Sequence, residues 1–170
     1  MKRMITIFLL MLPMSLQAGL ELEVDPFAFA LKGYSYHVAY KGGSLRTDIG
    51  AYGLTLKKAP GNPDFELEMD AQGVKIDYLF GEGWFTGVSL GSGTLDISCP
   101  TCVTQEAQTR QFTNKGVRFG VNIGAGHWYF APWLGVDQMS LEGDPVLIGS
   151  KTYQSPEFQL FPTIHLGYRF

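Results

Sequence analysis

The sequence lacks the features that mark several common classes of protein. Its 170 residues include two cysteines, in the run C-P-T-C, and no second pair that would complete a four-cysteine zinc site. Asp and Glu outnumber Lys and Arg by 16 to 13, so nothing in the charge suggests a nucleic-acid partner. After residue 18, no stretch shows the apolar spacing of three and four that is typical of an amphipathic helix. These absences leave β-structure as the class to test.

Cys99 and Cys102 stand alone, because none of the three histidines lies near them in the sequence. In a cytosolic βαβ unit the C-x-x-C spacing indicates redox chemistry. In an exported protein the same pair is more often a disulfide, which here would close the tip of a polar loop. We therefore expect a Cys99–Cys102 disulfide, with a redox-active pair as the alternative, and no metal site.

The first 18 residues have the composition of a secretory signal peptide. Lys2 and Arg3 provide the positive start, and an apolar run follows over residues 4–16. The small residues Ala18 and Gly19 then suit a cleavage site. We expect residues 1–18 to be removed and residues 19–170 to form one domain, with an uncleaved anchor as the alternative.

Segments of alternating polarity, separated by Gly-rich or Pro-rich breaks, run through the rest of the chain. Alternation with a period of two is typical of β-strands, whose side chains point to opposite faces in turn. The content of Gly (21) and aromatic residues (14%) suits a small barrel, in which Gly allows bends. Eight strands are predicted, at Leu20–Ala30, Tyr34–Lys41, Leu45–Leu56, Leu67–Phe80, Trp84–Ile97, Phe112–Ile123, Trp128–Ser140 and Glu157–Phe170.

The breaks between these segments alternate in length. Short Gly-rich turns occupy residues 42–43, 81–83 and 124–126, and long polar loops occupy residues 57–66, 99–111 and 141–155. The break near residues 31–33 is shorter than the pattern requires. With an even number of antiparallel strands, all the short turns fall at one end of a barrel and the long loops at the other.

The last segment shows the clearest alternation. Its even positions are apolar or aromatic from Phe158 to Phe170, and it ends on Leu166, Tyr168 and Phe170. This ending resembles that of bacterial outer-membrane β-barrel proteins, in particular small OmpA/OmpX-type barrels and uncharacterised families of such barrels. The resemblance implies an all-β fold, an eight-stranded antiparallel up-and-down transmembrane barrel in the bacterial outer membrane. It also implies that the β-barrel assembly machinery reads the last strand, and that outer-membrane lipid and lipopolysaccharide surround the protein. It brings no activity or cofactor and leaves the oligomeric state open.

The fourth segment changes phase in its middle. After Gly73 the apolar set is Val74, Ile76, Tyr78 and Phe80, whereas before it the set is Leu67, Met69 and Ala71. Two explanations fit this change. The strand has a β-bulge at this point, or its first half projects above the membrane.

The residues opposite the apolar face would point into the barrel, and most of them are charged. Buried charges need partners, because leaving one alone costs several kcal/mol. We therefore expect a salt-bridged lumen, with a narrow pore as the alternative. A soluble barrel of lipocalin type would carry its apolar face inside, which the charged inward set contradicts. The expected lumen network comprises His37, Arg46, Asp48, Lys75, Asp77, Arg118, Asp137, His165 and Arg169, with Glu21, Glu23, Asp25, Lys41 and Glu157 also inward.

A Ser–His–acid set can be drawn from Ser35, His37 and Asp48, which share the inward face of two neighbouring segments. The sequence has no G-x-S-x-G motif, and the three residues would face salt-bridge partners instead of lipid. We expect no enzyme activity and instead a structural or surface-interaction role for the external loops. A barrel enzyme that modifies lipid A or phospholipid is the alternative, as is a narrow pore for small solutes.

Overall fold

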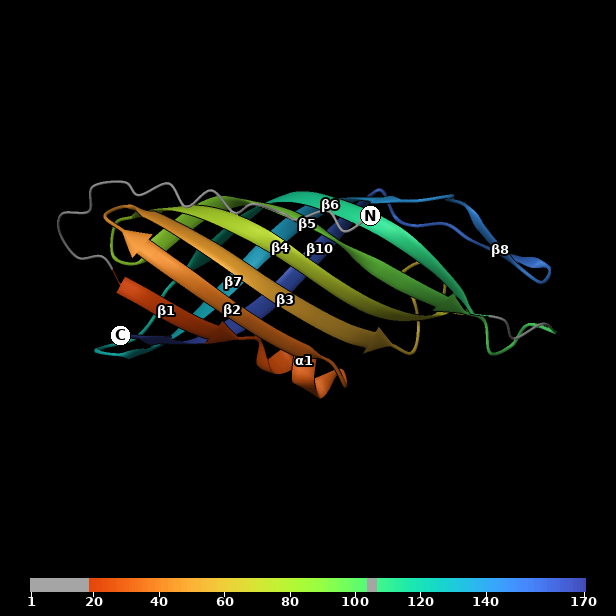
Figure 1. Ribbon diagram of the computed structural model, residues 1–170, viewed down its shortest axis with the longest axis horizontal. Helices are drawn as coiled ribbons and strands as arrows, with labels where there is room; N and C mark the ends of the chain where they lie inside the picture. Colours follow the sequence, from red (N-terminus) through yellow and green to blue (C-terminus); the bar gives the residue numbers. More distant parts are fainter. Residues whose placement is uncertain (1–18, 104–106) are drawn as a thin grey trace, which may run out of the picture.

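A single closed sheet forms the body of the protein in the computed structural model, which describes residues 19–103 and 107–170 (Figure 1). Neighbouring strands are antiparallel throughout, in the order β1-β10-β7-β6-β5-β4-β3-β2. The predicted eight-stranded antiparallel barrel is therefore confirmed, whereas the predicted signal peptide lies outside the described residues. The strands are β1 (Gly19–Val24), β2 (Tyr34–Gly42), β3 (Leu45–Leu56), β4 (Glu66–Phe80), β5 (Trp84–Ser98), β6 (Gln108–Val121), β7 (Trp128–Leu141) and β10 (Phe158–Arg169).

The short turns lie at one end of the barrel and the long connections at the other, as the alternation of break lengths predicts. In Figure 1 the turns between β2 and β3, β4 and β5, and β6 and β7 are at the left, with the carboxy terminus. Gly43 and Gly126 have φ angles of 60° and 69°, which only glycine adopts without strain in such tight turns. Below, these are called the turn end and the loop end.

A short helix, α1 (Pro26–Ala30), follows β1, where the sequence predicts the first strand to continue to Ala30. The prediction of no helix after residue 18 is therefore wrong. The Asp25 carboxylate accepts a hydrogen bond of 2.8 Å from the Phe27 amide, and Pro26 takes the first helical position, where its missing N–H costs nothing. Five residues are too few for a helical period to appear in the sequence. Within the described ranges, no helix is long and apolar enough to cross a membrane.

Two further boundaries differ from the predictions. β6 begins at Gln108, inside the predicted loop. The sequence predicts a loop here because the first outward residues of β6 are polar. The predicted loop at residues 141–155 contains a hairpin of β8 (Val146–Ile148) and β9 (Lys151–Tyr153), which projects at the right of Figure 1. Strands of three residues are too short to show alternation.

The two halves of the barrel wall have opposite polarity. On β4, the outward side chains of Val74 and Ile76 are 40% and 48% exposed, whereas the inward Leu67 and Met69 beyond Gly73 are 5% and 6% exposed. The pairing of β4 with β3 and β5 keeps one register from end to end, which excludes the predicted β-bulge. The phase change therefore marks the level at which the apolar face passes from the outside of the barrel to the inside.

The loop-end half of the barrel encloses an apolar core. Outside it, the same strands carry polar residues such as Glu68, Asp70 and Asp96. On β4 to β7 this half thus has the polarity of a water-soluble barrel, and the turn-end half has that of a membrane barrel. The buried core comprises Ala59, Phe65, Leu67, Met69, Ala71, Leu95, Ile97, Cys99, Cys102, Phe112, Met139, Val146, Ile148 and Tyr153.

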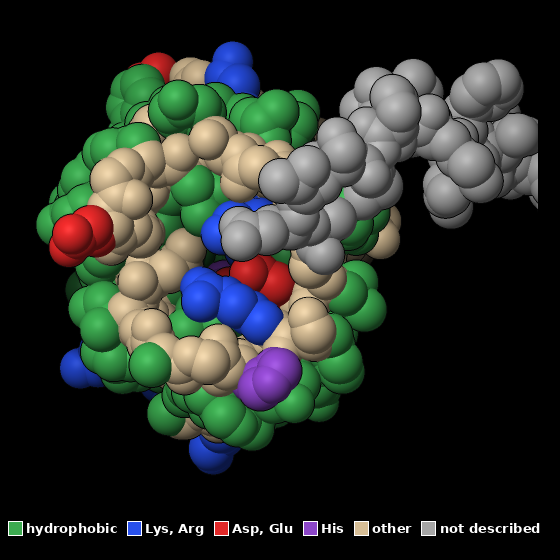
Figure 2. Space-filling model, turned by 90° about the vertical axis from the view of Figure 1, so that its left-hand side faces the viewer, with side chains coloured by type: hydrophobic (Ala, Val, Ile, Leu, Met, Phe, Trp, Pro, Cys, Tyr) green, Lys and Arg blue, Asp and Glu red, His purple; other side chains and the backbone are tan. Residues whose placement is uncertain are grey.

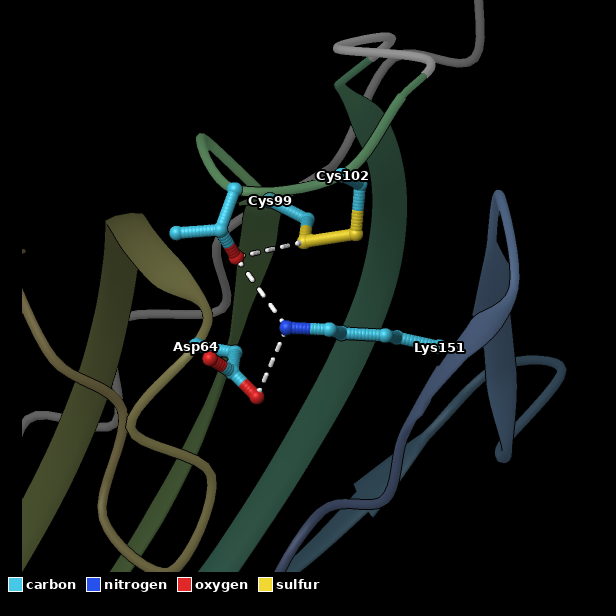
Figure 3. Close-up of a disulfide and its surroundings, with 5 residues drawn as sticks. Asp64, Cys99, Cys102 and Lys151 are labelled. Carbon is cyan, nitrogen blue, oxygen red and sulfur yellow. Dashed lines mark hydrogen bonds and ion pairs between the residues drawn. A yellow bond between two sulfur atoms is a disulfide. The ribbon is translucent and has the colours of Figure 1, made fainter.

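The loops over this core are fastened to one another. Cys99 and Cys102 form a disulfide, and both side chains are buried in the core (Figure 3). Beside it, the Lys151 ammonium lies 3.0 Å from the Asp64 carboxylate and 3.1 Å from the Thr101 hydroxyl, which joins three loops. Burial also raises the pKa of Tyr153 above its ordinary value. We call the loop of Asp64, the loop of Cys99 to Cys102 and the β8–β9 hairpin with Lys151 together the cap.

Replacing both cysteines of the cap by serine is expected to lower the free energy of unfolding by about 2 kcal/mol, because the disulfide closes only a four-residue loop. The barrel wall is expected to remain folded. Urea unfolding of the protein in lipid vesicles measures the loss. Lys57→Ala is the control, because its ion pair with Glu66 is exposed and contributes little. Equal stability of the double variant and the wild type would contradict a structural role for the disulfide.

Candidate functional site

Glycines on neighbouring strands make room for the side chains that fill the turn-end half of the barrel. A Cβ atom at Gly50 would overlap the ring Nδ1 of His37, and one at Gly116 would overlap a carboxylate oxygen of Asp137. Neither approach is possible for a real side chain. The inward glycines therefore determine where the polar residues of the lumen lie.

Arg46 is the centre of the buried ion-pair network. Its guanidinium lies 2.7 Å from Glu21, 2.7 Å from Glu23, 3.1 Å from Asp77 and 3.6 Å from Asp48. The side chain of Arg46 is only 5% exposed, so its charge is balanced by the four carboxylates and hardly solvated by water. A planar guanidinium with five N–H donors suits this arrangement, because it can address several acceptors at once.

Further residues extend the network toward the turn end. Arg118 forms a two-pronged ion pair with Asp77, with Nε 2.7 Å from Oδ1. Arg169 donates to Glu21 at 3.0 Å, and the Tyr129 hydroxyl contacts both Glu21 and Glu23. Figure 2, a view onto the turn end, shows Lys, Arg, Asp and Glu side chains inside a ring whose outside is apolar. Sequence reasoning missed Tyr129, although its place between the outward Trp128 and Phe130 indicates an inward side chain.

Two histidines and a lysine form the upper layer of the network. His37 Nδ1 lies 3.0 Å from Asp48 and 3.1 Å from the Lys75 ammonium. His165 Nδ1 lies 2.7 Å from Glu23, and the two imidazole rings stack with their centres 4.8 Å apart. We call these three residues the polar floor, because they close the turn-end side of the cavity described below.

Asp137 lies apart from the other eight residues of the expected network. They form one connected set of ion pairs through Arg46, whereas Asp137 accepts hydrogen bonds from Ser89 at 3.1 Å and Asn114 at 3.3 Å. Of the other residues predicted to point inward, Glu157 is exposed, so that prediction is wrong. Glu157 lies just before β10, where alternation no longer applies.

A cavity of about 150 Å³ lies between this polar floor and the apolar core of the loop end. The Ser35 hydroxyl, the Asn114 carbonyl oxygen and the Trp133 indole N–H line it and are buried without a hydrogen-bond partner among the described residues. Buried polar groups in proteins are nearly always paired, so such a group needs an explanation. The sequence also does not indicate Trp133 as a residue of the site, because Pro132 and the outward aromatic residues of β7 obscure the alternation of this strand.

The three candidate catalytic residues, Ser35, His37 and Asp48, all lie buried on the inner wall, on β2 and β3. The His37–Asp48 contact is that of a catalytic pair, but Lys75 competes for the same ring nitrogen. The Ser35 hydroxyl has no hydrogen-bond partner in the described part of the chain. The relay from serine to base that nucleophilic catalysis requires is therefore incomplete. In residues 19–103 and 107–170, no cluster of His, Cys, Asp or Glu is suited to hold a metal ion.

The carboxy-terminal residues lie on the outside of the barrel. Leu166 and Phe170 are 43% and 66% exposed, and the Tyr168 ring packs edge-on against Trp128 at 4.9 Å. The Phe170 amide donates to the Leu20 carbonyl at 3.0 Å, which ties the chain end to β1. These side chains are thus presented at the outer rim of the turn end.

Solved structures of other proteins share this fold. The N-terminal β-barrel domain of Pseudomonas aeruginosa OprF aligns over 90% of this chain and 96% of its own, with a TM-score of 0.50 and 13% identity. A major outer membrane protein from Thermus thermophilus aligns over 90% of this chain and 99% of its own, with a TM-score of 0.51 and 16% identity. The chain has the fold of an outer-membrane β-barrel. No family model matches the sequence of this barrel, and no curated protein does. At such identities the similarity concerns the fold alone.

Proposed function

We propose that the protein is an integral barrel of the bacterial outer membrane whose closed wall anchors the cap at the cell surface. The change of polarity along the wall carries this proposal. Around the turn-end half, outward side chains such as Ile49, Leu90 and Val117 are 64%, 64% and 60% exposed. A bilayer removes this apolar surface from water, and in the turn-end half each strand is paired with both of its neighbours, so no strand edge is left unpaired in hydrocarbon there.

The orientation follows from the lengths of the connections. Bacterial outer-membrane barrels have short periplasmic turns and longer external loops, and this pattern supports a position of the cap outside the cell. Export through a cleaved signal peptide at residues 1–18 belongs to the same proposal. So do contact with lipopolysaccharide and recognition of Leu166, Tyr168 and Phe170 by the assembly machinery.

The interior supports an anchor better than a pore. The ion-pair network around Arg46 occupies the turn-end half, and the apolar core around Leu95 and Ile97 occupies the loop-end half. An eight-stranded barrel has just enough interior for its side chains. We therefore do not propose solute transport along the barrel axis. Nor do we propose a lipid-modifying activity of Ser35, His37 and Asp48, because within the described residues no hydrogen bond links the serine to the histidine.

Fractionation of cells that express the full chain with its first 18 residues tests the proposal. The protein is expected in the outer membrane and to migrate differently on a gel before and after boiling, because a folded barrel resists detergent. A soluble periplasmic protein without this heat shift would refute the proposal.

Planar bilayers provide the second arm of the test. The purified barrel, added to a bilayer at high salt, is expected to give no steady conductance. Stable, uniform conductance steps from a heat-shifted sample would leave the membrane location standing and replace the anchor by a pore.

A further inference from the structure

The barrel wall has a gap in its hydrogen-bonded ladders near the cavity. The pairing of β1 with β10 stops at Val24 and Leu166, whereas β10 continues to pair with β7 as far as Phe158. Helix α1 lies at this gap and packs against β2, β3 and β10, as Figure 1 shows at its lower edge. A hydrogen bond from the Thr163 hydroxyl to Asp25 bridges it. The wall is therefore closed here by side chains and a short helix, which move more easily than paired strands.

The surroundings of the gap are apolar on the outside. Phe27 and Leu31 line the cavity and are also 51% and 42% exposed, so these two side chains separate the cavity from the outer surface. On β10, Phe158 and Leu160 are 61% and 70% exposed. If the barrel lies in a bilayer as proposed, this side of the cavity faces hydrocarbon instead of water.

The inner end of the cavity is polar and unsatisfied. Ser35 is 1% exposed, and its hydroxyl can both donate and accept a hydrogen bond. The Trp133 indole supplies a further donor and Asn114 a further acceptor, and none of these three atoms has a partner in the described ranges. An apolar entrance and an unsatisfied polar end together suit a molecule with the same two parts.

The charges around the cavity favour an uncharged polar group. Lys75 is the cation of its lining, and it already lies 3.6 Å from the Asp48 carboxylate. Asp137 is held by Ser89 and Asn114, and Asp25 by Thr163 and the amide of Phe27. A carboxylate or phosphate would enter beside these two carboxylates, and the described residues of the lining offer no unpaired cation to receive it. A charge placed there would be buried without compensation.

We infer that this cavity binds a neutral amphiphile with a terminal hydroxyl group, which enters from the bilayer between α1 and β10. The hydroxyl contacts Ser35, Asn114 and Trp133, and the hydrocarbon chain lies between Phe27, Leu31 and Pro162. The cavity volume of about 150 Å³ equals that of a protein cavity that takes up benzene, so about six carbon atoms fit inside. A longer chain would extend into the membrane.

Quenching of Trp133 fluorescence by brominated probes tests this inference. The double variant Trp84→Phe/Trp128→Phe keeps Trp133 as the fluorophore, and the protein is folded into phosphatidylcholine vesicles. Bromohexanol is expected to quench Trp133 with saturation. Bromohexane, which lacks the hydroxyl, is expected to bind about fivefold more weakly. Bromohexanoate is expected to give no saturable quenching.

Variants of the cavity separate binding from partition into lipid. Ser35→Ala is expected to weaken bromohexanol binding about fivefold, whereas Ser92→Ala, on the outer face of β5, leaves it unchanged. Ala28→Phe fills the entrance and is expected to abolish saturation, since Ala28 is buried in the cavity lining. Quenching that rises linearly, equally for all probes and in Ser35→Ala, would overturn the inference. Tightest binding of bromohexanoate would overturn the assigned ligand class.

The inference rests on the proposed membrane location, and the two fail differently. Each sample is first tested for the heat shift on a gel. A protein without the shift contradicts the membrane barrel itself. A heat-shifted protein without saturable quenching contradicts only the binding site.

Discussion

Replacement of Arg46 by leucine is expected to lower the free energy of unfolding of the barrel by about 3–5 kcal/mol. The variant removes a side chain that contacts Glu21, Glu23, Asp48 and Asp77 together. Breaking a buried ion pair from one side is costly, because the remaining charges stay buried without compensation. Urea unfolding in vesicles, followed by tryptophan fluorescence, measures the loss, and a gel shows whether any heat-resistant barrel remains.

Arg169→Leu is the matched control for Arg46→Leu. The Arg169 side chain is 31% exposed, and its ion pair is with Glu21. Because water can take over part of that interaction, we expect a loss of about 1 kcal/mol. Adding Glu23→Gln to Arg46→Leu is expected to restore part of the lost stability, since it removes one of the orphaned carboxylates. Equal losses for the two arginine variants would contradict the central place of Arg46.

Three lysine substitutions along β4 are expected to have very different effects. Ile76→Lys puts a charge on the lipid face and is expected to cost about 2–4 kcal/mol. Met69→Lys buries a charge in the apolar core of the loop end, so we expect a loss above about 4 kcal/mol. Glu68→Lys, next to Met69 but on the outer face beyond Gly73, is expected to change stability by less than about 0.5 kcal/mol.

The comparison of Met69 with Glu68 decides whether the wall changes polarity. In a membrane barrel with a polar lumen throughout, the inward Met69→Lys would be tolerated, as Lys75 is tolerated nearer the turn end of the same strand. If Met69→Lys unfolds at the same urea concentration as Glu68→Lys, the apolar core at the loop end is not required for stability. Unfolding in vesicles measures all three variants in one set.

The fold could be predicted from the sequence where alternation covers a whole membrane-facing strand. β3 and β7 have nearly the predicted bounds, because outward apolar residues such as Ile49 and Leu134 mark their membrane-facing halves and the turns and loops mark their ends. The start of β6 is not predicted, since its first outward residues are polar and lie beyond the level of the membrane, and the β8–β9 hairpin is not predicted because strands of three residues are too short to show alternation. In a water-soluble half-barrel the apolar residues point inward, whereas in a membrane-spanning half they point outward. A strand that passes through both halves therefore shows no single pattern of alternation.

The sequence predicts which side chains point into the barrel, but it does not predict which of them meet at the same level along the barrel axis. Alternation indicates that His37, Asp48 and Lys75 point inward, but it contains no information about which strands lie opposite across the lumen. The cavity depends on the glycines opposite these side chains and on α1, which follows from Asp25 and Pro26 acting together. Trp133 belongs to the site through its position in space, and no local motif marks it.

The apolar outer surface is not equally tall around the barrel. On β4 it runs from Phe80 to Val74, about 20 Å along the strand, whereas on β10 it runs from Phe170 to Phe158, about 40 Å. A membrane protein adapts to such a mismatch by tilting or by thinning the lipid on its shorter side. The barrel should therefore tilt in the bilayer, with the α1 side inserted deeper than the side of β4 and β5. The lipid should be thinner beside β4 and β5 than beside α1.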